Sequence, residues 1–426
     1  MQQEYIINRL GRKGEGVAVT DRGILYIPYT LPYERVLAEQ EEKAGSSNKK
    51  ADSAKLISVL APSPHRIEPL CPLFTQCGGC SMQHAAHQTY SEWKRKLVEE
   101  QLQRAGISFP VHPLIDAHGN GRRRVTFHAR FSNKTVVGFM AAGSHNLIEI
   151  PFCPVLEPEL KNAPNIARDI AEIFSKSAKT LDILISNSQS GYDVDIRGIG
   201  YLSDKLRLEL TELCTTLDLA RLSNHGDVIV ERRAPVILMG DSAVVPAPGA
   251  FLQATHLGEQ VIAEHVVSIT KGCKRVADLF SGCGPFTLRL AHHAEVHAVE
   301  METVMLQALN RAARMTSHLR RVTVEQRDLF RRPLLIPELD KFDAVVLDPP
   351  RAGAEAQCQQ LAKSHVPKVI LVSCNAATFA RDTALLMSGG YYCRSILPID
   401  QFLYSHHVEI IGFFEKPLQK KSKKRI

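Results

Sequence analysis

Several side chains that could do chemistry fall at the ends of predicted strands in the second half of the sequence. Cys374 ends the apolar run KVILVSC and precedes a segment of helical composition. Free cysteines are among the most buried residue types and usually behave as small apolar residues, so a position at the end of a strand does not by itself indicate a reactive thiol. Three carboxylates, Glu300, Asp328 and Asp348, end other strands of the same region. Because the carboxyl ends of parallel strands meet at one edge of a sheet, the pattern favours a nucleophilic thiol with a lowered pKa.

A cofactor pocket at the same edge is indicated by the segment VADLFSGCGPF at 276–286. It joins a strand to a helix through a turn in which Gly282 and Gly284 let a ligand approach the backbone. The glycine motif is shorter than a dinucleotide fingerprint. Glu300 lies where such folds hold ribose hydroxyls, and Asp328 could accept a hydrogen bond from the exocyclic amine of an adenine. A ligand with ribose and adenine but no phosphates fits, so we expect S-adenosylmethionine.

Strands and helices must alternate to bring these residues together, and such alternation begins after residue 246. The strand-like segments are RVADLF, EVHAVE, RVTVEQRD, FDAVVLD and KVILVSC. This order is typical of a doubly wound, Rossmann-like α/β sheet. Residues 1–68 are β-rich, which predicts a small barrel of the kind that binds single-stranded nucleic acid. A polar stretch at 41–55 predicts a long loop, and residues 69–245 indicate an α+β domain.

Three closely spaced cysteines, Cys71, Cys77 and Cys80, lie in the segment CPLFTQCGGC, and Cys153 lies far downstream in PFCPVL. This spacing, with two glycines that relax the backbone, indicates a metal site. Four thiolates bind zinc as readily as an iron–sulfur cluster, so the spacing leaves both open. The cysteines predicted to pack in the interior are Cys214, Cys273, Cys283, Cys358 and Cys393.

The composition excludes several classes of protein. Hydrophobic residues make up 44% and charged residues 23% of the chain, and no apolar run approaches the roughly 20 residues of a membrane span. The first residues lack the apolar core of a secretory signal, so we expect a cytoplasmic protein. Ten cysteines in 426 residues are too few for a disulfide scaffold. The net charge of +7 gathers in patches such as GRRRVTFHAR and the tail QKKSKKRI, which favours a nucleic acid partner.

The ordered motifs FLQAT, DLFSGCGPF, LDPPRAG, VSCNAAT and HHVEIIGFF resemble those of the RNA uracil carbon-5 methyltransferases. The segments GEGVAV and YIPYTLPYE are similar to a TRAM barrel. The resemblance covers nearly the whole chain. It implies a TRAM-like or OB-like barrel over 1–68, a central RNA-binding α+β domain with an iron–sulfur cluster over 69–245, and a class I methyltransferase domain over 246–426. It also implies S-adenosylmethionine as the methyl donor.

The resemblance further implies roles for individual residues. Cys374 would add to carbon 6 of uracil, which makes carbon 5 nucleophilic, and Glu409 would then remove the carbon-5 proton. Without the resemblance, Glu409 would be interpreted as a buried acid satisfied by neighbours such as His406 and His407. The implied cofactor contacts, besides the two glycines, are Gln253, Phe280, Glu300, Asp328 and Asp348. The implied ligands of a 4Fe-4S cluster are Cys71, Cys77, Cys80 and Cys153.

A uracil in folded RNA must leave its stack to reach a thiol, so the enzyme needs groups that hold the RNA. Phe251 is a candidate for stacking on a base. The candidates for an RNA clamp are Arg122, Arg123 and Arg124. Two positions depart from the family pattern, because Pro285 and Thr255 stand where many members have asparagine. Neither touches the reacting atoms, so we expect altered cofactor affinity rather than lost activity.

Family members that combine the barrel with the cluster resemble the 23S ribosomal RNA enzymes, so the resemblance implies 23S ribosomal RNA as the substrate, with transfer RNA as the alternative. A methyltransferase of exocyclic amines would place an aromatic residue where Arg351 follows the two prolines, and it needs no thiol. Cytosine carbon-5 enzymes usually carry Pro-Cys in this turn, where this chain has Pro-Pro. A non-catalytic RNA-binding assembly factor is disfavoured by the intact Cys374 and Glu409. We expect a monomer, and the sequence leaves open which uridine, or how many, is modified.

Overall fold

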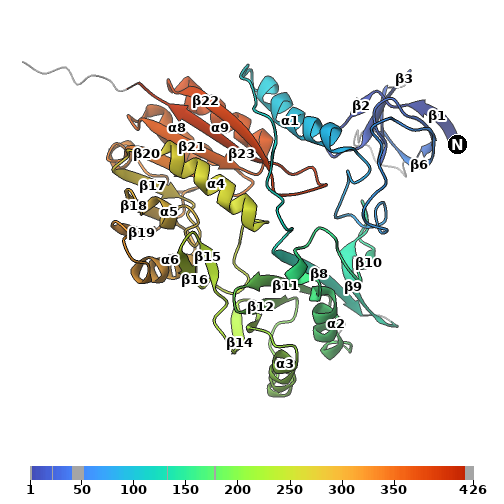
Figure 1. Ribbon diagram of the computed structural model, residues 1–426, viewed down its shortest axis with the longest axis horizontal. Helices are drawn as coiled ribbons and strands as arrows, with labels where there is room; N and C mark the ends of the chain where they lie inside the picture. The colour runs from blue at the N-terminus through green and yellow to red at the C-terminus, as the bar shows by residue number, and fades with distance from the viewer. Residues whose placement is uncertain (1, 22, 41–51, 132, 177–178, 418–426) are drawn as a thin grey trace, which may run out of the picture.

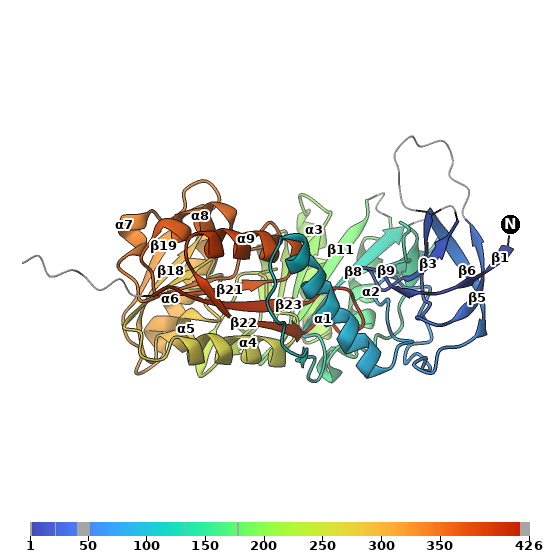
Figure 2. The same cartoon turned by 90° about the horizontal axis from the view of Figure 1, so that it is seen from above.

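The computed structural model describes residues 2–21, 23–40, 52–131, 133–176 and 179–417. Three sheets organise the chain: one near the N-terminus, one in the middle and a large one in the C-terminal part, and the first and last lie at opposite ends of the molecule (Figure 2). Most of the predicted loop at 41–55 and the whole basic tail QKKSKKRI lie outside the described residues.

The N-terminal sheet has the strand order β1-β5-β6-β4-β3-β2 and is strongly curved (Figure 1). One extended segment supplies both of its edges, because β1 pairs with β5 and its continuation β2 pairs with β3. The sheet therefore curls around a small core that includes Tyr5, Ile7, Leu25 and Val36. This half-barrel agrees with the β-rich unit predicted from the sequence. Its strands are β1 (Gln2–Ile6), β2 (Arg9–Leu10), β3 (Gly16–Thr20), β4 (Gly23–Ile27), β5 (Arg35–Gln40) and β6 (Asp52–Ala61).

The central sheet has the order β10-β9-β8-β11-β12-β13-β14 and is covered by two helices. Alternating apolar residues on β8 and β11 pack against the apolar face of α2, with Phe127, Ile170 and Ile183 in the shared core. The strands are β8 (Arg124–Phe131), β9 (Thr135–Met140), β10 (Leu147–Glu149), β11 (Leu181–Ser188), β12 (Gly191–Arg197), β13 (Arg221–Asn224) and β14 (Asp227–Glu231). The helices are the short 3-10 helix η1 (Pro158–Leu160), α2 (Ala163–Ile173) and α3 (Asp204–Thr216).

The C-terminal sheet has the order β19-β18-β17-β20-β21-β23-β22-β7. Five consecutive strands are parallel, as predicted, and helices cover both faces over two separate apolar cores. The strands are β17 (Arg275–Leu279), β18 (Glu295–Glu300), β19 (Val322–Gln326), β20 (Ala344–Leu347), β21 (Lys368–Ser373), β22 (Tyr392–Asp400) and β23 (Glu409–Glu415). The helices are α4 (His256–Ile269), α5 (Thr287–Leu290), α6 (Thr303–Met315), α7 (Ile336–Leu339), α8 (Glu355–Lys363) and α9 (Ala376–Ser388).

One strand of this sheet runs against the others, and its direction matters for the site. β23 pairs antiparallel with β21, in a register that sets Ser373 opposite Ile410. The carboxyl end of β21 therefore lies beside the amino end of β23. Cys374 follows β21 and Glu409 opens β23, so the pairing brings the two residues together.

The segment between the N-terminal sheet and the central sheet packs on the C-terminal sheet. Helix α1 (His87–Arg104) contacts α9, and β7 (Ile115–Asp116) pairs with β22. Val98, Leu102 and Ile107 belong to the same core as β20 and β21. Residues of the predicted central domain at 69–245 thus contribute a helix and one edge strand to the C-terminal sheet, because a helix without a sheet of its own must bury its apolar face elsewhere. A short hairpin of β15 (Ile237–Met239) and β16 (Ser242–Val244) packs on α6. No described helix is both long and apolar enough to cross a membrane.

Candidate active site

A cavity of about 470 Å³ lies at the carboxyl ends of the parallel strands. This is the edge where open α/β sheets bind ligands. The cavity brings together nearly all of the residues that sequence reasoning placed at this rim. Those that line it are Phe251, Gln253, Phe280, Gly282, Glu300, Asp328, Asp348, Cys374 and Glu409.

A buried chain of amides and carboxylates spans the inner end of this cavity. The Nε2 group of Gln401 donates to Oε1 of Gln253 at 2.6 Å and to Oε2 of Glu409 at 2.9 Å. The Nε2 group of Gln253 donates in turn to Oδ2 of Asp348 at 3.3 Å. Sequence reasoning missed Gln401, whose only signal is a polar residue after a predicted strand. Its partner Gln253 is 148 residues away in the chain, and only the fold makes them neighbours.

Two acids of this cavity, Glu409 and Asp348, have raised pKa values. Burial, and then the charge of Asp348, raises the pKa of Glu409 to about 8. Burial and the charge of Asp278 raise the pKa of Asp348 to about 7. Desolvation penalises the charged form of each acid, and the neighbouring acid adds repulsion.

The thiol of Cys374 has a pKa raised to about 11, by burial first and then by Glu409 and Asp348. The expectation of a lowered thiol pKa was therefore wrong for the protein without ligands. Arg351 acts in the favourable direction, but burial and the two carboxylates outweigh it. The pKa depends on which charges the fold collects around the thiol, and a position at the start of α9 does not reveal them.

The outer end of the cavity has the features that an adenosine ligand needs. Glu300 is held by three backbone N–H donors, from Gly282 at 3.0 Å, Met301 at 2.7 Å and Glu302 at 3.1 Å. Its orientation is therefore fixed before any ligand binds. Asp328 accepts from the N–H of Phe330 at 3.0 Å.

Two buried polar atoms at this end have no hydrogen-bond partner among the described residues: Ser281 Oγ, in the cavity wall, and Oδ1 of the fully buried Asp278. Buried polar atoms are normally paired. The rings of Phe280 and Phe330 lie 5.5 Å apart and border the cavity. The residues present therefore fit S-adenosylmethionine.

Gly284 and Thr255 do not line the cavity but stabilise the elements beside it. A Cβ atom on Gly284 would lie 2.3 Å from Cδ1 of Leu309, and Gly284 itself does not line the cavity. The structure thus assigns Gly284 to packing against α6 rather than to cofactor contact. Thr255 is the N-cap of α4 and accepts from the N–H of Gly258 at 2.9 Å. Threonine and asparagine both cap helices, which explains why threonine is tolerated at this position.

Comparisons with known proteins agree with this geometry. The family model described as tRNA (Uracil-5-)-methyltransferase matches residues 247–417. An uncharacterised RNA methyltransferase of Mesorhizobium japonicum is 43% identical over 99% of this chain and 100% of its own length. The 23S rRNA (uracil(1939)-C(5))-methyltransferase RlmD of Halomonas elongata is 32% identical over 98% of this chain and 90% of its own. This chain belongs to the RNA uracil-5-methyltransferase family. It is an S-adenosylmethionine-dependent RNA (uracil-5-)-methyltransferase.

The fold of the enzyme is similar to one solved structure over nearly its full length. The tRNA (uracil-54, C5)-methyltransferase of Pyrococcus abyssi, in complex with S-adenosyl-L-homocysteine, has a TM-score of 0.75 at 22% identity. The match covers 96% of this chain and 99% of that one. The predicted combination of an N-terminal β unit and a Rossmann-like C-terminal domain is therefore confirmed as a fold.

The three arginines proposed as an RNA clamp have different surroundings. Arg123 is only 4% exposed, and its guanidinium donates to Oε2 of Glu259 at 2.6 Å and to the carbonyl of Gln253 at 3.0 Å. The assignment of Arg123 to RNA was therefore wrong, because a buried and paired arginine cannot reach a phosphate. Arg124 lies over the exposed ring of Phe251, with 5.6 Å between its guanidinium carbon and the ring centre. Phe251 is thus held in place while its free face stays open.

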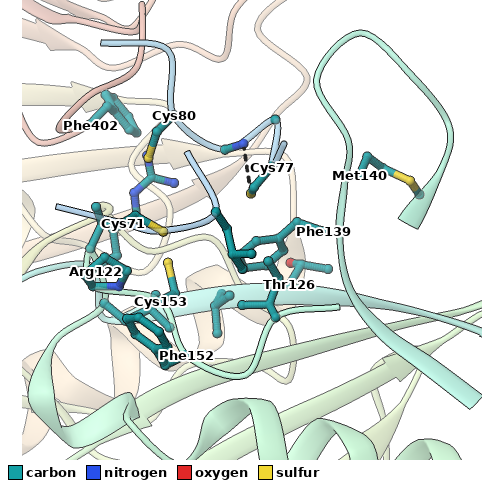
Figure 3. Close-up of a pocket in the computed structure, with 18 of the residues that line it drawn as sticks. Cys71, Cys77, Cys80, Arg122, Thr126, Phe139, Met140, Phe152, Cys153 and Phe402 are labelled. Atoms are coloured by element: carbon teal, nitrogen blue, oxygen red, sulfur yellow. Dashed lines mark hydrogen bonds between the residues drawn. The ribbon is translucent and has the colours of Figure 1, made fainter. Parts of the chain in front are cut away.

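Arg122 borders a second cavity, of about 570 Å³, which the four predicted metal ligands also line. Figure 3 shows Cys71, Cys77, Cys80 and Cys153 around this space. Burial raises the pKa of the Cys80 and Cys153 thiols, and the charge of Arg122 acts in the opposite direction. Nε of Arg122 is buried without a hydrogen-bond partner among the described residues. In the described part of the chain, no three side chains of the metal-binding types are placed closely enough to hold a single metal ion.

The two cavities share a wall formed by Phe251, Leu252 and Phe402. Phe402 lies in the loop of residues 401–408, which joins β22 to β23 and borders both cavities. The cysteine segment holds this loop, because the N–H groups of Ser81 and Met82 donate to the carbonyl of Tyr404 at 2.8 and 3.2 Å.

Helix α1 holds the same loop through a buried cluster of polar groups. The Nζ group of Lys94 donates to Oδ1 of Asp400 at 2.5 Å and to the carbonyl of Phe402 at 3.1 Å. The hydroxyl of Tyr90 donates to Oδ2 of Asp400 at 2.5 Å and accepts from the N–H of Tyr404 at 2.9 Å. The cysteine segment and α1 therefore position the loop that carries Gln401.

Proposed function

We propose that the enzyme methylates carbon 5 of a uridine in RNA through a covalent adduct between Cys374 and carbon 6 of the base. The observation that carries this proposal is the antiparallel pairing of β21 with β23, which puts a thiol and a buried carboxylate in one cavity. A uracil needs a nucleophile at carbon 6 and a base at carbon 5, and these carbons are adjacent. The residues that would hold the methyl donor, Glu300 and Asp328, line the same cavity.

In the proposed reaction, the thiolate of Cys374 adds to carbon 6, and the electron pair of the carbon 5–carbon 6 double bond moves toward the carbonyl at carbon 4. S-adenosylmethionine supplies the methyl group that carbon 5 then takes. Glu409 removes the proton that remains on carbon 5. The carbon–sulfur bond breaks, the double bond re-forms and the thiolate leaves.

We infer that two further residues, Gln253 and Asp348, orient the base. Gln253 and Asp348 form a hydrogen-bonded pair in the wall between the cofactor end and Cys374. Because the pKa of Asp348 is raised to about 7, this residue can present either a donor or an acceptor to a uracil edge near neutral pH. The exposed ring of Phe251 offers a stacking surface at the cavity mouth.

For the substrate we propose 23S ribosomal RNA, acted on by a cytoplasmic monomer. Support comes from the Halomonas elongata relative, whose name states a 23S rRNA substrate and which aligns over 98% of this chain. Transfer RNA is the second candidate, and it rests on the fold of the Pyrococcus abyssi enzyme alone. Incubation of the enzyme with labelled S-adenosylmethionine and each RNA, followed by mass-spectrometric mapping of 5-methyluridine, distinguishes the two.

We also propose that Cys71, Cys77, Cys80 and Cys153 hold a 4Fe-4S cluster that shapes an RNA-binding surface between the barrel at 1–68 and the catalytic domain at 246–426. All four thiols border one cavity of about 570 Å³. Four cysteine thiolates are the usual ligand set of such a cluster. The unpaired N–H of Arg122 provides a donor for an anionic cluster.

Two variants test the covalent mechanism directly. Cys374→Ala should abolish methyl transfer and adduct formation. Glu409→Gln should form the adduct but release it slowly, so that a protein–RNA species survives denaturation on a gel. Cys393→Ser is the matched control, because Cys393 lies on β22 outside the active-site cavity. Full activity in Cys374→Ala would exclude the mechanism.

A further inference from the structure

A third cavity, of about 170 Å³, is lined by Cys374 and by none of the proposed cofactor contacts. It is bordered by Arg12 from the N-terminal sheet, Arg351 from the Pro-Pro turn, and His406 and His407 from the loop before β23. Three parts of the chain that are distant in sequence therefore converge on it. Its remaining lining residues are Leu97, Gln101, Cys374, Asn375, Ala376 and Val408.

This cavity is positively charged and has no acidic lining residue. Within the described residues, neither Arg12 nor Arg351 forms an ion pair, and Nη2 of Arg351 lies 3.3 Å from Nε2 of His407. The rings of His406 and His407 lie 4.2 Å apart. Burial, followed by the charges of Lys13, Arg12, Arg351 and Lys94, lowers the pKa of His406.

His407 experiences the same environment. Its pKa is lowered to about 3, by burial first and then by His406, Arg351, Lys94 and Arg122. The cavity thus gathers cationic and hydrogen-bonding groups that lack an anion. Helix α9 begins at Ala376, at the edge of the cavity, and the positive end of its dipole adds to this potential.

The cavity is continuous with the active site, because Cys374, Arg351 and His407 line both. The position of the thiol then restricts what can occupy it. In the usual anti conformation of a pyrimidine nucleotide, carbon 6 of the base lies over the 5′ side of the ribose. A thiol that attacks carbon 6 must therefore stand near the 5′-phosphate of the same nucleotide.

We propose that Arg12, Arg351, His406 and His407 form the binding site for the RNA phosphate on the 5′ side of the target uridine. This assignment rests on the proposed function, and it gives the N-terminal sheet a direct part in placing the target nucleotide. Arginine holds phosphate through paired N–H groups, and the imidazoles can add further donors. The phosphate would thereby fix the ribose while the base enters the catalytic cavity.

The test is a double-mutant cycle in which one member is an arginine of the protein and the other is the charge of one phosphate in the RNA. The substrate is an RNA oligonucleotide that the wild-type enzyme methylates, with either the natural phosphate or a neutral methylphosphonate 5′ to the target uridine. Arg12→Gln removes one partner far from the cofactor end. Arg9→Gln is the matched control, since Arg9 is an exposed cation of the same N-terminal sheet that does not line the cavity. Affinity is measured by fluorescence anisotropy with S-adenosylhomocysteine bound, so that no turnover occurs.

We expect Arg12→Gln to weaken binding of the natural RNA roughly tenfold or more and to reduce the salt dependence by about one phosphate contact. The methylphosphonate should weaken RNA binding by the wild type and by Arg9→Gln by a similar factor, but leave binding by Arg12→Gln nearly unchanged. Arg12→Lys should restore part of the affinity. Equal losses from the methylphosphonate in the wild type and in Arg12→Gln would overturn the proposal, even if methylation continues.

A second arm separates this proposal from the proposed function. If no RNA is methylated by the wild type, the proposed function fails, and inorganic phosphate becomes the probe of the cavity. Phosphate should slow the alkylation of Cys374 by iodoacetamide in the wild type and not in Arg12→Gln, as read by peptide mass spectrometry. Equal protection of both proteins would refute an anion site here. If phosphate protects Cys374 but the methylphosphonate does not change the affinity for RNA, the cavity binds free anions, and the assignment to an RNA phosphate is overturned.

Discussion

Gln401 donates a hydrogen bond of 2.9 Å to Oε2 of Glu409, and both side chains are buried. Gln401 also donates to Oε1 of Gln253. Oε1 of Gln401 accepts a hydrogen bond from the N–H of Ala254 at 2.9 Å. The amide is therefore fixed in orientation by the chain that also leads to Asp348. The hydrogen bond from Gln401 lowers the pKa of Glu409, whereas burial raises it. Gln401 therefore stabilises the ionised carboxylate, which is the form of Glu409 that can accept a proton.

Replacement of Gln401 by leucine should slow the release of product rather than the formation of the adduct. Gln401→Leu removes the donor that favours ionised Glu409, so we expect kcat to fall ~10- to 100-fold while the covalent species accumulates. Affinity for S-adenosylmethionine, measured by calorimetry, should change little. Gln260→Leu on the exposed face of α4 is the control. An unchanged kcat would show that Gln401 only fills space.

The sequence predicted the rim of the sheet well and the interactions behind it poorly. Cys374, Glu300, Asp328 and Asp348 follow strands of a regular βα alternation, which makes their position predictable. The sequence does not distinguish Arg123 from the neighbouring arginines. Only the fold shows that Arg123 is buried and forms an ion pair with Glu259. Gln401 is held by Gln253, which lies 148 positions away in the chain. The raised pKa of Cys374 depends on Glu409 and Asp348, which the neighbouring strands β23 and β20 bring beside it. Periodicity encodes neither set of contacts.

The pH dependence of Cys374 should respond to Glu409. Burial and the two carboxylates Glu409 and Asp348 raise the thiol pKa to about 11, while Arg351 lowers it. Removing one negative neighbour favours the thiolate, so the rate of alkylation of Cys374 by iodoacetamide should rise at lower pH in Glu409→Gln than in the wild type. Peptide mass spectrometry across pH 7 to about 10 measures both profiles. Identical profiles would show that Glu409 does not influence the thiol.

The activity of the wild type should rise with pH for the same reason. The pKa of Glu409 is raised to about 8, so in the ligand-free enzyme the carboxyl group is mostly protonated below that pH and cannot act as a base. The thiol is also mostly protonated there. We therefore expect kcat/KM to increase from neutral pH through pH 8, since this parameter reports the free enzyme. A kcat/KM that is level over this range would contradict the raised pKa values.

Tyr90→Phe should loosen the loop of residues 401–408 without touching either ligand. The variant loses the hydrogen bond to Asp400 and the acceptor for the N–H of Tyr404. Such losses cost about 1 to 3 kcal/mol of folding stability, so the melting temperature should fall by several degrees. Because the loop carries Gln401 and Phe402, KM for RNA should rise while cofactor affinity is kept. Asp400→Asn should be worse, since it leaves Lys94 buried without a negative partner.

Loss of one cysteine of the second cavity should affect RNA binding more than cofactor binding. Cys77→Ser removes one thiolate, so anaerobically purified protein should lose the broad visible absorbance of an iron–sulfur cluster. The cavity shares Phe251 and Phe402 with the active site, and Ser81 and Met82 hold Tyr404, so disorder in the cysteine segment should spread to the loop beside Gln401. We expect weaker binding of RNA and a lower melting temperature at nearly unchanged affinity for S-adenosylmethionine. Cys393→Ser, outside the cavity, should behave as the wild type. A colourless wild-type protein with one zinc ion per chain would refute the cluster and leave the structural role of the four thiols to zinc.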